Sequence, residues 1–158
     1  MKKRNFTDIL LWVVTAELTG VLSALFSGGF SDFYDRYVQP PLLPPPWLFP
    51  VVWTILYALM GFSAYLVCSS EESPLKKRNA LRVYFIQLAL NFSWSIVFFR
   101  LEALISAAAV IIALLGAVIV MTVRFYRTVP LAGYLNIPYI VWTAFASYLN
   151  IAVILLNA

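Results

Sequence analysis

Three sets of polar and aromatic residues recur at helical spacing inside long apolar runs of the sequence. Residues three and four positions apart share one face of a helix. The sets are Gln87, Asn91, Trp94 and Phe98; Tyr139, Trp142, Ala146 and Asn150; and Trp53, Tyr57 and Gly61. Such stripes fit either a packed helical core or the wall of a ligand cavity. Since amides in hydrocarbon need hydrogen-bond partners, Gln87, Asn91 and Asn150 either bond one another or line a cavity.

Glu17 is a carboxylate near the centre of an apolar run. A carboxylate at mid-membrane depth costs about 2.5–3.5 kcal/mol on insertion scales. We therefore expect Glu17 to be neutral. It is either a proton or ligand site, or it is hydrogen-bonded to another helix.

Small residues at four-residue spacing accompany Glu17 and recur later in the chain. The two sets are Ala16, Gly20 and Ala24, and Ala109, Ala113 and Ala117. Small side chains let helix backbones approach closely. Each set could pack within one bundle or between two protomers.

The elements that must position these residues are membrane-spanning helices. Of the 158 residues, 63% are hydrophobic and only 11% are charged, against about 25% charged in soluble domains. A span needs about 20 apolar residues. The sequence predicts five spans, over 9–26, 46–68, 81–99, 104–123 and 131–156. We therefore expect a single domain over 1–158, an all-α integral membrane protein built as a five-helix bundle. A signal peptide is the alternative for the first run, but its length and Glu17 favour a retained helix.

The first connection, over 27–45, is unusually long for a small bundle. It is rich in Gly, Pro and aromatic residues. Long connections of this kind in compact domains are commonly functional, so we expect a packed lid. In the fifth span, Pro138 removes one backbone hydrogen bond and is predicted to kink the helix.

Basic residues divide unequally between the two ends of such a bundle. The N-terminal segment and the second and fourth connections carry Lys2, Lys3, Arg4, Lys76, Lys77, Arg78, Arg82, Arg124 and Arg127; the other end carries Arg36 and Arg100. Basic residues concentrate on the cytoplasmic side of membrane proteins. We predict a cytoplasmic N-terminus, with the long connection and the C-terminus outside, in a bacterial-type cell membrane. The net charge of +4 is then a topology signal rather than a nucleic-acid surface.

The sequence lacks the residues that several kinds of chemistry need. The chain has no His, a single Cys, Cys68, and only six Gly with no glycine-rich phosphate loop. Imidazole catalysis, a His-ligated metal and an intrachain disulfide are therefore excluded. We expect no metal and no cofactor.

Their depth in the membrane places residues of all three stripes in the half of the bundle near the first connection. Trp53 falls in the outer half of its span. Asn91 and Trp142 fall near the middle, and Trp94 and Ala146 lie outward of them. A cavity among these residues would open toward Tyr34 and the proline cluster. An aromatic pocket with a few amides and a lid is typical of small-molecule sites.

The same residues carry a family resemblance. The chain reads PPLLPPPWLFPVVWTILYALMG over 40–61, QLALNFSWSIVFF over 87–99 and PYIVWTAFASYLN over 138–150. In order and spacing these segments resemble the TspO/MBR family, which includes translocator proteins (peripheral benzodiazepine receptors) and bacterial tryptophan-rich sensory proteins. The resemblance covers nearly the whole chain.

The resemblance implies a function. The family fold is a five-helix bundle, usually a homodimer, with a pocket under the first connection that binds porphyrins such as protoporphyrin IX and synthetic benzodiazepine or isoquinoline ligands. Porphyrin is then a ligand rather than a cofactor, and the protein is a binding and sensing protein. The pocket residues that match by motif are Tyr34, Trp53, Asn91, Trp94, Trp142 and Ala146.

The sequence also departs from the family pattern. Leu42, Phe33 and Phe92 stand where tryptophan is often found, and no basic residue follows Tyr148 to complete the family's sterol motif. Sterol binding through that motif is therefore not expected. From sidedness alone, Arg36 and Arg100 could meet porphyrin propionates.

Two alternatives remain open from sequence. Some bacterial relatives are associated with light-dependent porphyrin breakdown attributed to pocket tryptophans, which Trp53 and Trp142 match. Such an activity would rest on light, oxygen and indole redox chemistry, because no conventional catalytic set is visible. Transport of porphyrin or lipid is the other alternative, although five helices without an inverted repeat are few for a transporter.

Overall fold

The structure is a computed structural model that describes residues 5–28 and 35–158. Those residues form helices and no strand. The long helices are α1 (Phe6–Ser27), α3 (Leu48–Cys68), α4 (Pro74–Ser95), α5 (Leu104–Thr128) and α7 (Ile137–Leu156). A π-helical turn, η1 (Ile96–Arg100), continues α4, and a short α6 (Pro130–Tyr134) precedes α7. Five helical segments are long and apolar enough to cross a membrane, so the chain is an integral membrane protein with the five-helix bundle that the sequence predicts.

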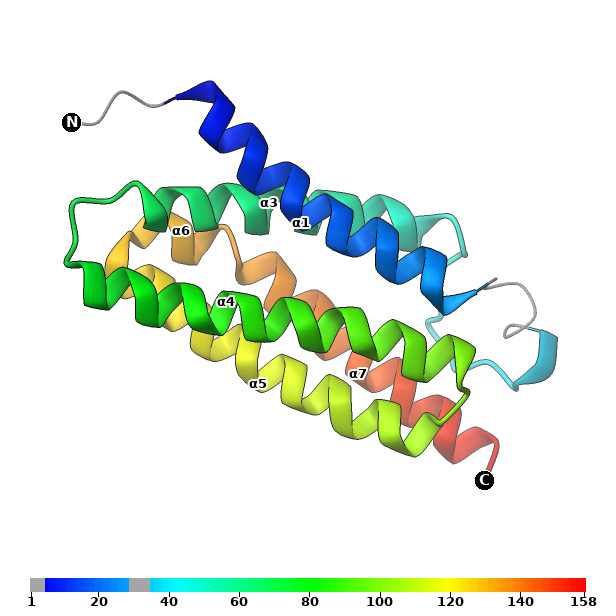
Figure 1. The fold of residues 1–158 in the computed structure, drawn as a ribbon. Helices are drawn as coiled ribbons and strands as arrows, with labels where there is room; N and C mark the ends of the chain where they lie inside the picture. The colour runs from blue at the N-terminus through cyan, green and yellow to red at the C-terminus, as the bar shows by residue number, and fades with distance from the viewer. Residues whose placement is uncertain (1–4, 29–34) are drawn as a thin grey trace.

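The ends of the bundle differ in the connections they carry. The start of α1 and the α3–α4 and α5–α6 connections lie at one end, and the C-terminus and the described part of the first connection lie at the other (Figure 1). We call these the basic end and the loop end. Lys2, Lys3, Arg4, Phe33 and Tyr34, which entered the sequence predictions, lie outside the described residues.

Two helices are longer at the basic end than the sequence predicts. Helix α4 begins at Pro74 rather than at residue 81, because the Ser73 side chain accepts a hydrogen bond from the Lys76 N–H at 3.4 Å and proline suits the first turn. Helix α5 continues to Thr128 instead of ending at residue 123. Hydropathy marks where a helix leaves the hydrocarbon, whereas the helix itself continues into its charged turns.

The predicted kink at Pro138 is a full interruption. Helix α6 ends at Tyr134, and Pro138 occupies the first turn of α7, where its missing N–H leaves no hydrogen bond unmade. The buried Asn136 lies at the break. Its Nδ2 donates to Ser63 Oγ at 2.8 Å and to Ala132 O at 2.7 Å. The Asn136 side chain thus donates to the Ala132 carbonyl, which the break in the helix leaves without a backbone donor.

Helix α1 lies on the surface of the bundle, where it packs mainly on α3 and to a smaller extent on α4. A Cβ at Gly61 would lie 2.6 Å from Val13 Cα, and one at Gly20 would collide with the Tyr57 ring. Ala16 is fully buried. Ala16 and Gly20 of the first set therefore pack within the bundle, whereas Ala24 is exposed, as are Ala109 and Ala113 of the second set.

The larger of two clusters of buried apolar residues lies toward the basic end. It includes Met60, Tyr84, Leu114, Phe125 and Tyr139. A smaller cluster around Trp94, Phe98 and Ile111 lies toward the loop end. The cavities described next adjoin this smaller cluster, and Trp94 lines both of them.

Candidate functional site

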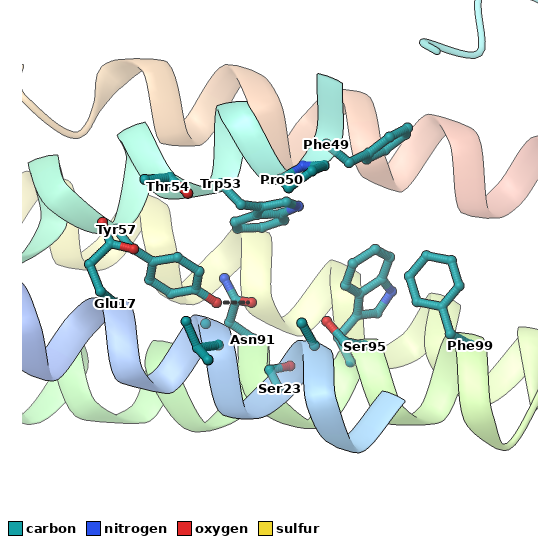
Figure 2. Close-up of a pocket in the computed structure, with 14 residues that line it drawn as sticks. Glu17, Ser23, Phe49, Pro50, Trp53, Thr54, Tyr57, Asn91, Ser95 and Phe99 are labelled. Atoms are coloured by element: carbon teal, nitrogen blue, oxygen red, sulfur yellow. Dashed lines mark hydrogen bonds between the residues drawn. The ribbon is translucent and has the colours of Figure 1, made fainter. Parts of the chain in front are cut away.

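A cavity of about 170 Å³ lies between α1, α3 and the end of α4, and we call it the α1 cavity. Figure 2 shows its side chains converging from the three helices. Its lining comprises Glu17, Gly20, Val21, Ser23 and Ala24 of α1; Phe49, Pro50, Trp53, Thr54 and Tyr57 of α3; and Asn91, Trp94, Ser95 and Phe99 of α4 and η1. Aromatic rings supply most of the wall, and a few hydroxyl, amide and carboxyl groups are interspersed.

Two indoles, Trp53 and Trp94, line this cavity. Trp53 packs with its ring centroid 5.7 Å from that of Tyr57 and 6.1 Å from that of Tyr139. Trp94 stacks on Phe98 at 5.4 Å, and its Nε1–H donates to Asn150 Oδ1 at 3.3 Å. Both side chains are therefore held by neighbours on other turns or helices, as a preformed aromatic site requires.

A buried hydrogen-bond network closes the inner end of the α1 cavity, which is the end toward the middle of the bundle. Tyr57 O–H donates to Asn91 Oδ1 at 3.0 Å, the dashed line in Figure 2. Asn91 Nδ2 donates to the Tyr139 hydroxyl at 2.7 Å, and that hydroxyl donates to Gln87 Oε1 at 2.8 Å. Gln87 Nε2 reaches Met60 Sδ at 3.5 Å. The Tyr139 hydroxyl therefore bonds Asn91 and Gln87, two of the three amides in the stripes. Asn91 also lines the α1 cavity.

Glu17 lies at the inner edge of the same cavity. Its side chain reaches from α1 toward α3 beside Tyr57 (Figure 2). Within the described residues it makes no hydrogen bond and no ion pair, so the interhelical hydrogen bond that we considered for it is not found there. The carboxyl remains available as an acceptor, or as a donor when protonated, to whatever occupies the cavity.

A second, smaller cavity of about 30 Å³ lies against α7, and we call it the α7 cavity. It contains Ala146 and Asn150 of the helix-five stripe. Its full lining is Gln39, Leu43, Phe49, Trp94, Phe98, Phe99, Ala146, Leu149, Asn150 and Val153. Phe49, Trp94 and Phe99 line both cavities. These three rings therefore form the partition between the two spaces.

Trp142 lines neither of these two cavities. Its ring packs on Phe49 at 5.8 Å and on Phe145 at 5.7 Å. Its Nε1–H is buried and has no hydrogen-bond partner among the described residues. A buried donor left unsatisfied typically costs about 1–3 kcal/mol, and such groups call for an explanation. Phe49 stands between this indole and the α1 cavity.

Four contacts fasten the first connection to the loop end. Glu102 forms an ion pair with Arg36 at 2.7 Å and accepts from Tyr37 O–H at 3.0 Å. That hydrogen bond to the carboxylate raises the pKa of Tyr37 above its ordinary value. Asn157 bonds both the N–H and the carbonyl of Val38, at 2.8 and 3.0 Å.

The fourth contact joins Tyr148 O–H to Pro41 O at 3.1 Å. The described part of the connection is thus tied to α7 and to the turn before α5. Arg36 and Arg100, which could meet porphyrin propionates by their sidedness, already have partners within the protein. Arg36 is paired with Glu102, and Arg100 Nη1 donates to Phe26 O at 3.2 Å.

The structure thus brings together Glu17, Trp53, Asn91 and Trp94 in one cavity and Trp94, Ala146 and Asn150 in the other. It places Gln87 in the network behind them and Trp142 behind Phe49. The sequence reasoning overlooked Phe49. Its position four residues before Trp53, on the same helical face, could have revealed it. Among the described residues no three Cys, Asp or Glu side chains converge to hold a metal ion.

Fold and cavity together define a class of protein, a membrane-embedded five-helix bundle with an aromatic cavity toward one end. The family model of the TspO/MBR family matches residues 11–156. The chain therefore belongs to the TspO/MBR family.

Three relatives illustrate the similarity. The chain is 34% identical to Protein CrtK of Rhodobacter capsulatus, over 97% of this chain and 94% of that protein. It is 38% identical to the tryptophan-rich protein TspO of Archaeoglobus fulgidus, over 92% and 97%. It is 35% identical to the human translocator protein, over 77% and 72%.

Proposed function

We propose that this protein binds and senses a planar apolar small molecule in the α1 cavity, and that a porphyrin, protoporphyrin IX, is its best candidate. The observation that carries the proposal is the pair of fixed indoles, Trp53 and Trp94, facing one space within the membrane-spanning bundle. Aromatic faces favour stacking with flat π systems. The absence of His removes the commonest axial ligand of haem iron, so a metal-free macrocycle fits better than haem.

The size of the cavity implies that it must enlarge around such a ligand. Pockets for drug-sized molecules have about 300–1,000 Å³, and the α1 cavity has about 170 Å³. Displacement of Phe49 would enlarge the cavity most, because this side chain lies in the partition and covers Trp142. Moving it would join the two cavities and would give the Trp142 N–H access to a ligand acceptor.

The mouth of the α1 cavity suggests the route of entry. Val21 and Ala24 of α1 and Pro50 and Thr54 of α3 line the cavity and are exposed. All four lie within membrane-spanning helices, so the opening between α1 and α3 faces the bilayer. A lipid-soluble ligand would enter sideways, with its carboxylate edge toward the loop end and away from Glu17.

Light-dependent porphyrin breakdown is the second candidate activity. Trp53 lines the cavity, which favours this chemistry at that indole. Trp142 could contribute only after Phe49 moves. The network that closes the inner end of the cavity argues against transport through the bundle. The homodimer implied by the family resemblance and the bacterial-type cell membrane expected from the division of basic residues belong to the same proposal.

A titration of the purified protein with protoporphyrin IX, followed by tryptophan fluorescence in the dark and under illumination, tests both candidates. We expect saturable quenching, weakened about three- to ten-fold by Trp53→Leu, since ring stacking is worth about 0.5–1.5 kcal/mol. Phe49→Ala should bind at least as tightly as the wild type. Trp12→Leu is the matched control, because Trp12 lines neither cavity. Equal affinity in all variants would show that porphyrin merely partitions into detergent or lipid. A product spectrum that needs both protein and light would support the breakdown activity.

A further inference from the structure

A basic hollow lies at the end of the bundle opposite the cavities. It has an open volume of about 500 Å³ between the start of α4 and the end of α5. Its lining is Lys76, Asn79, Ala80, Arg82, Arg124, Arg127 and Thr128. Four of these side chains are cationic and none is acidic.

The positive charge of this hollow is only partly neutralised within the protein. Lys76 pairs with Glu72 at 2.7 Å, and Arg124 Nη1 donates to the Asn79 carbonyl at 2.8 Å. Arg82 and Arg127 make neither a hydrogen bond nor an ion pair with any residue in the described ranges. Two guanidinium groups, each with five N–H donors, are therefore available beside the same open space.

If these basic residues served only to orient the chain in the membrane, they would not need to meet in one hollow. Basic residues scattered over the connections would orient the chain equally well, and Arg78 of the same segment does not line the hollow. The four cations meet because α4 and α5 are antiparallel neighbours that pack extensively on each other. Their first and last turns therefore come side by side (Figure 1).

The hollow also continues into an apolar, outward-facing surface. Ile86 lies one turn along α4 from Arg82 and is 55% exposed, and Val120 lies one turn along α5 from Arg124 and is 45% exposed. Both belong to membrane-spanning segments. A ligand whose charged group sat in the hollow would thus have hydrocarbon directly beside it, where acyl chains belong.

We propose that this hollow binds the phosphate headgroup of an anionic phospholipid. Arginine binds phosphate oxygens through two parallel N–H donors, and basic pockets between membrane helices recognise acidic lipid headgroups. The attached acyl chains lie along Ile86 and Val120. The lipid, rather than a free phosphate, is the occupant because the apolar surface adjoins the cations. This site is independent of the porphyrin cavity.

Native mass spectrometry of the full chain, released from detergent after titration with dioleoylphosphatidylglycerol, tests the proposal. Dioleoylphosphatidylcholine is the lipid with the same acyl chains and no net charge, and inorganic phosphate supplies the anion without them. Arg82→Gln and Arg127→Gln each remove one cation from the hollow. Arg78→Gln removes one cation from the same end outside it. Melting temperatures confirm that each variant is folded.

We expect tighter retention of phosphatidylglycerol than of phosphatidylcholine. Arg82→Gln and Arg127→Gln should each weaken phosphatidylglycerol binding about five-fold, whereas Arg78→Gln should change it less than two-fold. Equal retention of the two lipids by the wild type would overturn the proposal. So would an equal loss in Arg78→Gln, which would indicate diffuse charge. Displacement of the lipid by inorganic phosphate at matched concentration would instead identify a site for soluble anions.

Discussion

The Tyr139 hydroxyl joins three helices in the middle of the bundle. It accepts from Asn91 on α4, donates to Gln87 on the same helix and belongs to α7, while Asn91 in turn accepts from Tyr57 on α3. Buried polar groups in low dielectric are stabilising when all are satisfied and costly when one is lost. This network therefore holds Asn91 at the inner wall of the α1 cavity.

Tyr139→Phe should lower the free energy of unfolding by about 1–3 kcal/mol, because it leaves the Asn91 and Gln87 amides without their shared partner. Tyr84→Phe is the matched control. Tyr84 is equally buried, and its hydroxyl has no hydrogen-bond partner in residues 5–28 and 35–158, so its removal should be neutral or stabilising. Melting temperatures in detergent give the comparison. An equal loss in the two variants would show that the hydrogen bonds of the Tyr139 hydroxyl add no stability beyond that of an unbonded buried hydroxyl.

Glu17→Leu should melt no lower than the wild type, because the carboxyl has no partner among the described residues and the substitution removes an intramembrane polar group. Glu17→Gln should fall between the two. Thermal melts of the three proteins without ligand check this. A marked drop for Leu alone would reveal a partner for the carboxyl that the described residues do not supply.

Sequence spacing anticipated part of this site and missed the rest for a physical reason. The helical period placed Trp53, Asn91 and Trp94 toward a common interior, and the structure has them on one cavity. The period could not show that Phe49 would cover Trp142. Which of two neighbouring rings reaches a cavity depends on side-chain packing rather than on position along a helix.

At the scale of elements, the partition of three rings separates the two cavities. Phe49 comes from α3, Trp94 from α4 and Phe99 from η1, and α7 closes the far side with Ala146. The π-helical turn at Ile96–Arg100 lies at this partition, and such turns are often found at functional sites. Sequence motifs predicted the helices here, but not the π turn or the break at Asn136.

Ala146→Leu should weaken porphyrin binding about ten-fold if the ligand spans both cavities, because the larger side chain fills the α7 cavity next to the partition. Overpacking should lower the free energy of unfolding by about 1–3 kcal/mol, which leaves the bundle folded. Fluorescence titration beside a thermal melt checks both effects. A folded Ala146→Leu protein with wild-type affinity would confine the ligand to the α1 cavity.

At the scale of the whole molecule, the two ends have different properties. The loop end holds the cavities and the contacts to the described part of the first connection, and the basic end holds the larger core cluster and the basic hollow. The sequence predicted the number of spans, which follows from its apolar runs, and the division of charge, which follows from the positions of Lys and Arg. It could not predict that four of the cations would meet in one hollow, which depends on how α4 and α5 pack.

Reporter fusions should place the C-terminus outside and the α3–α4 connection in the cytoplasm. The reason is the nine-to-two division of Lys and Arg between the two ends. Alkaline phosphatase and green fluorescent protein fused after Ala158, and inserted within 71–78, provide opposite readouts. Fluorescence from the C-terminal fusion together with phosphatase activity from the inserted one would reverse the topology.

The structure of the protein in complex with protoporphyrin IX tests the central claim most directly. The account predicts density for the macrocycle in the α1 cavity, between Trp53 and Trp94, with Phe49 displaced and the carboxylate edge toward the loop end. Density for the porphyrin on a lipid-facing surface or between two copies, with the α1 cavity unfilled and Phe49 in place, would contradict it.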